Sequence, residues 1–149
     1  MDEKLFSTLE FDKIRLLLAE RAAFSGGKDL ASTLAPSRSL KEADRWQGET
    51  EEAVRILSVA GQPPFGGMRD VREILRRAER GAVLLPGEIL EVGDAARASA
   101  RLRAFLEAHA PAVEAETLAD LAGILGRFPK LEREIDRCLS REGEVVDHA

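Results

Sequence analysis

The chain has 149 residues, of which 44% are hydrophobic and 33% are charged, a balance typical of a folded globular protein. A single Cys excludes a disulfide framework, and 22 Ala and 20 Leu favour helices over a β-sandwich, which needs more β-branched and aromatic residues. The net charge of −5 argues against a self-sufficient nucleic-acid-binding domain. The sequence predicts an all-α protein without a signal peptide or a membrane-spanning segment.

The first part of the chain is expected to form three helices. A short helix covers residues 5–9, and a longer helix with a broad apolar stripe covers residues 12–22. A Ser-Gly-Gly break follows, where Ser25 can cap a third helix that ends near residue 34, ahead of Pro36.

The next helix has clear signals at both ends. Ser39 and Glu42 have the spacing of a capping box, in which each side chain accepts a hydrogen bond from the backbone of the other. Apolar residues then recur on one face as far as Ala60, and Gly61 is expected to end the helix.

Residues 61–70 read GQPPFGGMRD, which predicts a turn-rich loop because Pro and Gly dominate turns. Asp70 and Glu73 repeat the capping-box spacing in front of a short helix that Gly81 ends.

Proline positions divide the second half of the chain. Pro residues in the first turn predict a long helix over 86–108 and a last helix over 129–139, with a further helix over 118–125 between them. Residues 143–147, GEVVD, predict a short strand or extended tail without an identifiable partner strand. The expected architecture is an irregular bundle of about seven helices, forming a single helical module over residues 1–149.

Motifs for catalysis or cofactor binding are missing from the sequence. It contains neither GxxxxGK[ST] nor GxGxxG, and His109, His148 and Cys138 lack metal-ligand spacing. Cys138 is expected to be a packing residue, Trp46 a core residue, and acid pairs such as Glu51–Glu52 part of solvated faces. We therefore expect no catalytic residue, cofactor site or metal site in this chain.

One basic pattern has a functional interpretation. Four arginines at helical spacing predict a single stripe that begins at the Gly-rich loop: Arg69, Arg72, Arg76 and Arg80. Arg97 and Arg101 form a second such pair. These stripes could contact phosphates or an acidic partner, whereas the alternative is an ordinary solvated helix face.

Three sequence segments occur in a recognisable order. They read TLEFDKIRLLLAERA at 8–22, PPFGGMRDVREILRRAERGAVL at 63–84 and LEREIDRCLSREGEVVDHA at 131–149. Together they resemble the N-terminal region of the second bacterial MutS family, the mismatch-repair-related ATPases that usually carry a C-terminal Smr nuclease domain. The most specific parts are the Pro-Pro-x-Gly-Gly-x-Arg-Asp run and the Cys-x-x-x-x-Gly-Glu-Val ending. The resemblance spans nearly the whole chain, although residues 103–127 match only as generic helix.

The resemblance implies that the chain is the first part of a helical core domain, with residues 129–149 leading toward missing lever helices. It implies a homodimeric parent that hydrolyses ATP with magnesium, binds structured DNA and suppresses homologous recombination. The single Cys and the lack of a signal peptide predict a cytoplasmic location. It also implies a parent that splits stalled or collided ribosomes, which would make rRNA a partner. Walker motifs, clamp and Smr segment are absent from these residues, so no ATP-binding or nuclease residue is assigned, and the module is expected to act through the remainder of the parent chain.

Two other hypotheses remain open. The chain could be a free-standing helical protein–protein adaptor that docks through Phe65 and Met68 of the turn-rich loop. It could also have weak, salt-sensitive nucleic-acid affinity of its own, which Arg72→Ala and Arg76→Ala would reduce.

Overall fold

A computed structural model describes residues 10–146, and the helix expected over residues 5–9 lies outside this range. The all-α prediction is confirmed, because the described residues form seven α-helices and one 3-10 turn, without a strand. The elements are α2 (Phe11–Arg21), α3 (Ser25–Thr33), α4 (Leu40–Ala60), α5 (Arg72–Glu79), α6 (Pro86–His109), η1 (Pro111–Val113), α7 (Glu116–Ile124) and α8 (Pro129–Cys138). None of the helices in this range is long and apolar enough to cross a membrane.

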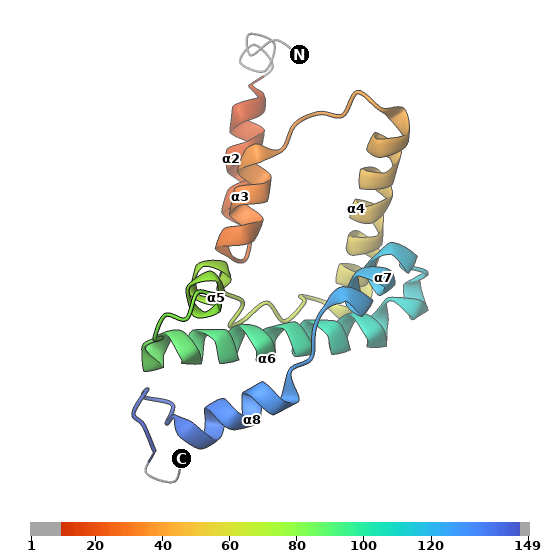
Figure 1. Cartoon of the computed structure of the whole chain (residues 1–149). Helices are drawn as coiled ribbons and strands as arrows, with labels where there is room; N and C mark the ends of the chain where they lie inside the picture. The colour runs from red at the N-terminus through yellow and green to blue at the C-terminus, as the bar shows by residue number, and fades with distance from the viewer. Residues whose placement is uncertain (1–9, 147–149) are drawn as a thin grey trace.

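The main core lies where α4, α6, η1 and α7 meet (Figure 1). Its buried residues are mostly small: Ile56, Leu106, Ala110, Ala115 and Ala122. Alanine at these contacts lets the helix backbones approach closely, and partly buried Leu and Phe side chains close the edges of the core. Helix α6 is the longest element, and it runs past this core to carry α5 and α8 near its other end (Figure 1).

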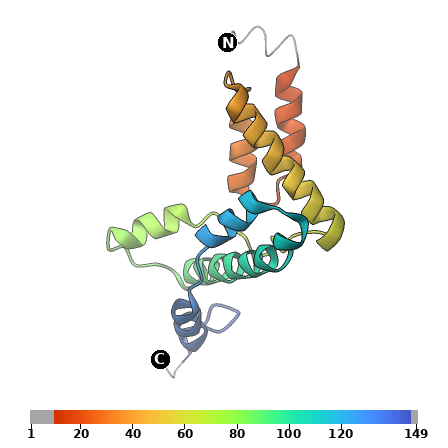
Figure 2. The same cartoon turned by 90° about the vertical axis from the view of Figure 1, so that its right-hand side faces the viewer.

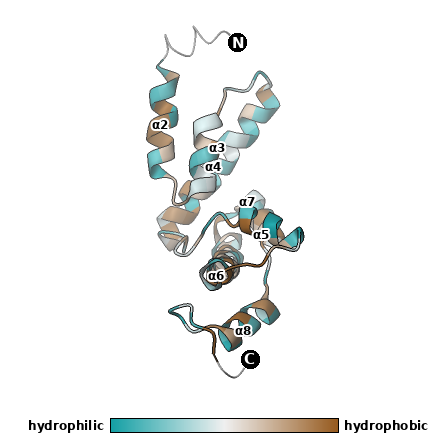
Figure 3. Ribbon diagram, turned by 60° about the vertical axis from the view of Figure 1, so that its left-hand side comes forward, coloured by the Kyte–Doolittle hydropathy of each residue, from teal (hydrophilic) through white to brown (hydrophobic). Residues whose placement is uncertain are grey.

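Helices α2 and α3 form a hairpin that stands apart from this core (Figures 1 and 2). Arg15, within α2, donates a 2.6 Å hydrogen bond from Nε to the carbonyl of Leu34 at the end of α3, which joins the two helices of the hairpin. Helix α2 has no buried residue, and α3 buries only Ala31. The hairpin leaves much apolar surface in solvent, because Leu16 and Leu17 of α2 and Leu30 of α3 are 61–75% exposed. Figure 3 shows the hydrophobic residues along α2 in brown.

The structure modifies the predicted capping boxes. At α4, Ser39 Oγ accepts from the Glu42 N–H at 3.4 Å, but the Glu42 carboxylate accepts from the Ser37 hydroxyl instead. At α5, Val71 is the N-cap residue, and Asp70 accepts from the Arg72 N–H at 3.1 Å. The prediction for Asp70 and Glu73 was therefore wrong, because Asp70 lies one residue too early to cap its helix and forms a tight local turn.

The turn-rich loop predicted at 61–70 is confirmed, and it lies along α6. Gly61 ends α4 with φ +74°, and Gly67 has φ +80°. Arg101 of α6 donates a 2.6 Å hydrogen bond from Nη2 to the Gly66 carbonyl, and a Cβ on Gly67 would lie 3.4 Å from that same Nη2. The loop is thus held on α6 by its backbone. Phe65 and Met68 are half-buried.

The C-terminal segment has a partner that the sequence did not reveal. Val145 forms an isolated antiparallel bridge with Leu139, because residues 140–143 make a tight turn at the end of α8. Gly143 occupies that turn with φ +83°. The expected tail is thus the second arm of a small hairpin within the described residues, and Asp147 lies outside them.

Candidate functional surfaces

The four arginines of the predicted stripe lie on and around α5, and we call them the arginine surface. Helix α5 is the light green helix that projects from the rest of the molecule in Figure 2. Arg72 is the first residue of α5 and Arg76 lies within it, whereas Arg69 belongs to the preceding loop and Arg80 is the C-cap residue. All four side chains belong to exposed residues. Helix α5 itself buries no residue, and it is joined to the start of α6 by an ion pair between Arg77 and Glu88.

Two of the four arginines already have carboxylate partners. Arg72 pairs with Asp70 at 2.5 Å and lies 3.7 Å from Asp29 of α3, while Arg76 pairs with Glu73 at 3.1 Å. The side-chain hydrogen bond from Arg72 lowers the pKa of Asp70 to about 2. A phosphate reaching Arg72 or Arg76 would have to compete with these carboxylates.

Arg69 and Arg80 differ from their neighbours, since neither side chain forms an ion pair or hydrogen bond with a residue of the described range, and Arg80 bonds Arg76 only through its backbone N–H. The structure therefore brings the predicted residues to one exposed part of the molecule but divides them into a paired and an unpaired set.

The second basic pair, Arg97 and Arg101, is used inside the fold. Arg97 bonds Asp94 on its own helix at 3.0 Å and Asp136 of α8 at 3.1 Å. Arg101 donates a hydrogen bond to the carbonyl of Gly66 in the turn-rich loop. Both guanidinium groups join segments that are distant in sequence, which argues against a phosphate-binding role for this pair.

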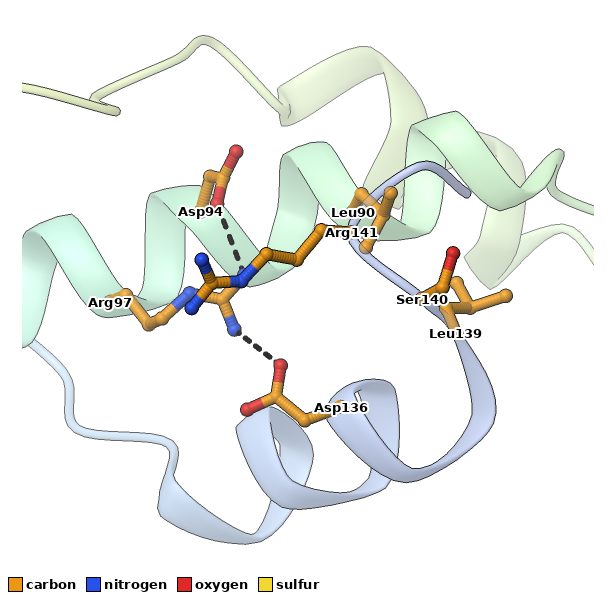
Figure 4. Close-up of a pocket in the computed structure, with 7 residues that line it drawn as sticks. All are labelled: Leu90, Asp94, Arg97, Asp136, Leu139, Ser140 and Arg141. Carbon is orange, nitrogen blue, oxygen red and sulfur yellow. Dashed lines mark hydrogen bonds and ion pairs between the residues drawn. The ribbon is translucent and has the colours of Figure 1, made fainter. Parts of the chain in front are cut away.

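A cavity of about 410 Å³ lies beside Arg97, between α6, α8 and the C-terminal turn. Figure 4 shows Asp94 and Arg97 on α6, Asp136 on α8, and Arg141 reaching from the turn across the opening. The remaining lining residues are Leu90, Leu139 and Ser140. Two carboxylates and two guanidinium groups balance in charge, so the cavity has no net charge that would select an anion or a cation.

Cys138 and Trp46, which the sequence analysis predicted to be packing residues, are both partly covered by the fold. Cys138 is a free thiol, half-buried at the end of α8, and Trp46 is half-buried on α4. Among the residues that the structure describes, no group of three His, Cys, Asp or Glu side chains is arranged to hold a metal ion.

The interpretation of Glu51 and Glu52 as a solvated pair was wrong for Glu52. Glu51 is exposed, but Glu52 is only 9% exposed and binds the first turn of α7. Its Oε1 accepts from the Thr117 N–H at 3.2 Å and from the Thr117 hydroxyl at 2.9 Å, and its Oε2 accepts from the Leu118 N–H at 2.9 Å. Burial raises the pKa of Glu52, but the hydrogen bonds from Leu118 and Thr117 outweigh this effect and the net pKa is lowered.

A sequence signal for this contact was present. Helix α7 begins after Ala115, which has no side-chain acceptor, so the N–H groups of its first turn need a partner from elsewhere in the chain. A carboxylate is well suited to the positive end of a helix dipole. The sequence does not reveal which of the many acids supplies it.

The amino-acid sequence is similar to the sequences of bacterial MutS2 endonucleases. The endonuclease MutS2 of Geobacillus sp. is 39% identical over 150 residues, that of Symbiobacterium thermophilum is 43% identical over 152, and the putative endonuclease MutS2 of Bacillus subtilis is 38% identical over 150. Each alignment covers 100% of this chain but only 18–19% of the relative. No family model matches the chain. The chain therefore spans about a fifth of the length of these relatives.

Proposed function

We propose that this chain, which matches MutS2 endonucleases along its entire length, is the non-catalytic helical core module of a MutS-type ATPase and endonuclease. The parent binds structured DNA, suppresses homologous recombination and splits stalled or collided ribosomes. ATP and magnesium bind to the remainder of the parent, which acts as a homodimer. The observation that carries the proposal is the whole-chain match to proteins about five times longer.

The side-chain chemistry supports a mechanical role. Arg97 links α6 to α8, Arg101 links α6 to the loop before α5, and Glu52 links α4 to α7. Charged groups that join helices in this way can transmit a displacement from one end of a module to another. The adaptor hypothesis has less support, because Phe65 and Met68 are half-buried in a loop that α6 holds in place.

Catalysis is tested first with the 149-residue chain alone. Incubated with ATP and magnesium, it is expected to release no phosphate above the buffer rate. Robust hydrolysis that copurifies with the folded chain would contradict the proposal.

Coupling is tested in the full-length protein with Arg97→Ala, which removes the link between α6 and α8. ATP hydrolysis is measured alone, with a four-way DNA junction and with stalled ribosomes. The stimulated rate is expected to fall while the basal rate is kept, and the ligand that stimulates identifies the main substrate of the parent. Arg133→Ala is the matched control, because among residues 10–146 the Arg133 side chain bonds only the Pro129 carbonyl within α8. Equal stimulation in wild type and Arg97→Ala would contradict a coupling role for this module.

A further inference from the structure

An apolar groove of about 970 Å³ separates the α2–α3 hairpin from the first half of α4, and none of the elements described above fills it. Phe11 and Leu18 of α2 line one wall, and the segment that joins α3 to α4 lines the end. The other wall is α4, through Ala43, Trp46 and their neighbours. Figure 1 shows the α2–α3 hairpin and α4 as two separate columns.

The wall formed by α4 has the spacing of a coiled-coil seam. The lining residues Ala43, Trp46, Thr50 and Ala53 are separated by three, four and three positions. Leu57, which is 41% exposed, follows after four more. This alternation of three and four keeps side chains on one stripe of a helix, where they receive the side chains of a partner helix. The two alanines leave room for a close approach, and Trp46 offers a large apolar contact.

The wall formed by α2 has the same spacing. Phe11 and Leu18 line the groove, and Ile14, 52% exposed, lies between them at a distance of three and four positions. Leu17 widens the stripe and is 62% exposed. Two helices that present such stripes across one groove offer the contact surfaces that a third helix of a bundle would need.

The charged residues that line the groove are acidic, which favours a basic ligand. Glu49 and Glu51 line the groove, and no Lys or Arg is among the described residues that line it. Arg45 lies 3.5 Å from Glu49, whereas Glu51 forms no ion pair within the described range. An occupant with basic residues beside its apolar stripe would therefore be favoured.

We propose that this groove, between α2 and α4, holds an amphipathic helix with basic flanks, supplied by the part of the longer polypeptide outside residues 1–149. The inference rests on the proposed function, since the relatives are matched over only 18–19% of their length and four-fifths of such a chain is available to supply the helix. A second copy of this chain fits less well. Its own apolar stripes face the same groove, so two copies would meet with Glu49 and Glu51 opposed to the same acids of the partner.

Cysteine labelling tests the proposal without use of ATPase activity, so its failure is distinguishable from failure of the proposed function. Thr50→Cys is made in the 149-residue chain and in the full-length protein, each with Cys138→Ser and other cysteines replaced, and its reaction with a maleimide is timed. Thr50 is exposed in this structure and belongs to the groove. We expect labelling in the full-length protein to be slower by about tenfold or more, because the site reacts only when the bound helix leaves.

Val83→Cys is the matched control, because Val83 is 90% exposed and is not among the described residues that line the groove. It is expected to react at equal rates in both proteins. Equal rates at Thr50→Cys would overturn the proposal. Protection in the 149-residue chain that increases with concentration, together with a doubled mass in solution, would assign the groove to a second copy and would also overturn it.

Discussion

Glu52 joins two helices, because its carboxylate on α4 accepts hydrogen bonds from residues of α7 that are more than sixty positions away in the chain. Its carboxylate accepts three hydrogen bonds from the first turn of α7, which has no cap of its own. A buried acceptor set of this kind is costly to disrupt, since the N–H groups left behind lose their partners without gaining water.

We expect Glu52→Gln to lower the free energy of unfolding by about 2 kcal/mol, because the neutral amide offers one acceptor oxygen and loses the charge-assisted bonds. Urea denaturation of the 149-residue chain measures the change. Glu51→Gln, at the exposed neighbouring position, is the control and should stay within about 0.5 kcal/mol of wild type. Equal effects of the two substitutions would contradict the assigned role of Glu52.

The same residue predicts a pH dependence. The pKa of Glu52 is lower in the folded chain than its ordinary value of 4.5, so its contribution to stability is fully present above pH 4.5. That contribution is lost as the pH falls through the folded pKa, where the carboxylate becomes protonated. The difference in unfolding free energy between wild type and Glu52→Gln should therefore be constant above pH 4.5 and shrink below it. A difference that grows on acidification would contradict the prediction.

At the scale of elements, the loop before α5 depends on one glycine. Gly67 has φ +80°, in the left-handed region, and it lies against α6 beside Arg101. Gly67→Ala is expected to cost about 1–2 kcal/mol, because a Cβ is strained in this backbone conformation. Gly66→Ala is the matched control, since a Cβ there meets nothing within 4 Å. Thermal unfolding followed by circular dichroism compares the two, and a larger loss for Gly66→Ala would contradict the account.

Helix α5 is expected to be less stable than α6. It has eight residues, buries none of them, and is joined to the rest by exposed or half-exposed ion pairs through Arg72 and Arg77. Such pairs contribute little individually. Amide hydrogen exchange followed by mass spectrometry should therefore show α5 exchanging well before the middle of α6. Slower exchange in α5 than in α6 would contradict this ranking.

The helices themselves could be predicted from the sequence because their end signals are local. Pro86 and Pro129 begin helices, and Gly61 and Gly81 follow the ends of others, as the sequence indicates. The contacts between helices could not be predicted in the same way. Nothing near Glu52 marks it as buried, because its partners Thr117 and Leu118 lie on another helix.

The candidate arginine surface was likewise predictable only in part. Spacing placed Arg72 and Arg76 on one helix correctly, but it could not show that nearby carboxylates already bind them. Ion pairs depend on side-chain directions, and these follow from where α5 begins. The structure starts α5 at Arg72, two residues after Asp70, so Asp70 bonds Arg72 and does not cap the helix.

At the scale of the whole molecule, the net charge limits the affinity of the chain for nucleic acid. With a net charge of −5 the chain as a whole repels phosphate, whereas residues 69–80 around α5 are locally basic, with five Arg against three acids. Of the arginine surface, Arg72 and Arg76 have carboxylate partners, whereas Arg69 and Arg80 have none in the described range. Any direct affinity of the 149-residue chain for DNA or RNA is therefore expected to be weak and to depend on the second pair.

Two double variants of equal net charge distinguish direct arginine–phosphate contacts from the effect of the net charge of the chain. Arg69→Ala with Arg80→Ala should reduce the slope of log affinity against log salt by about 2, because each phosphate contact contributes close to one unit. Arg72→Ala with Arg76→Ala should reduce it less, because these groups give up Asp70 and Glu73 to reach a phosphate. Fluorescence anisotropy with a branched DNA and with an RNA hairpin, over a salt series, measures both slopes. Equal slopes would show that only net charge matters, and undetectable binding at low salt would reduce the arginine surface to a solvated helix face.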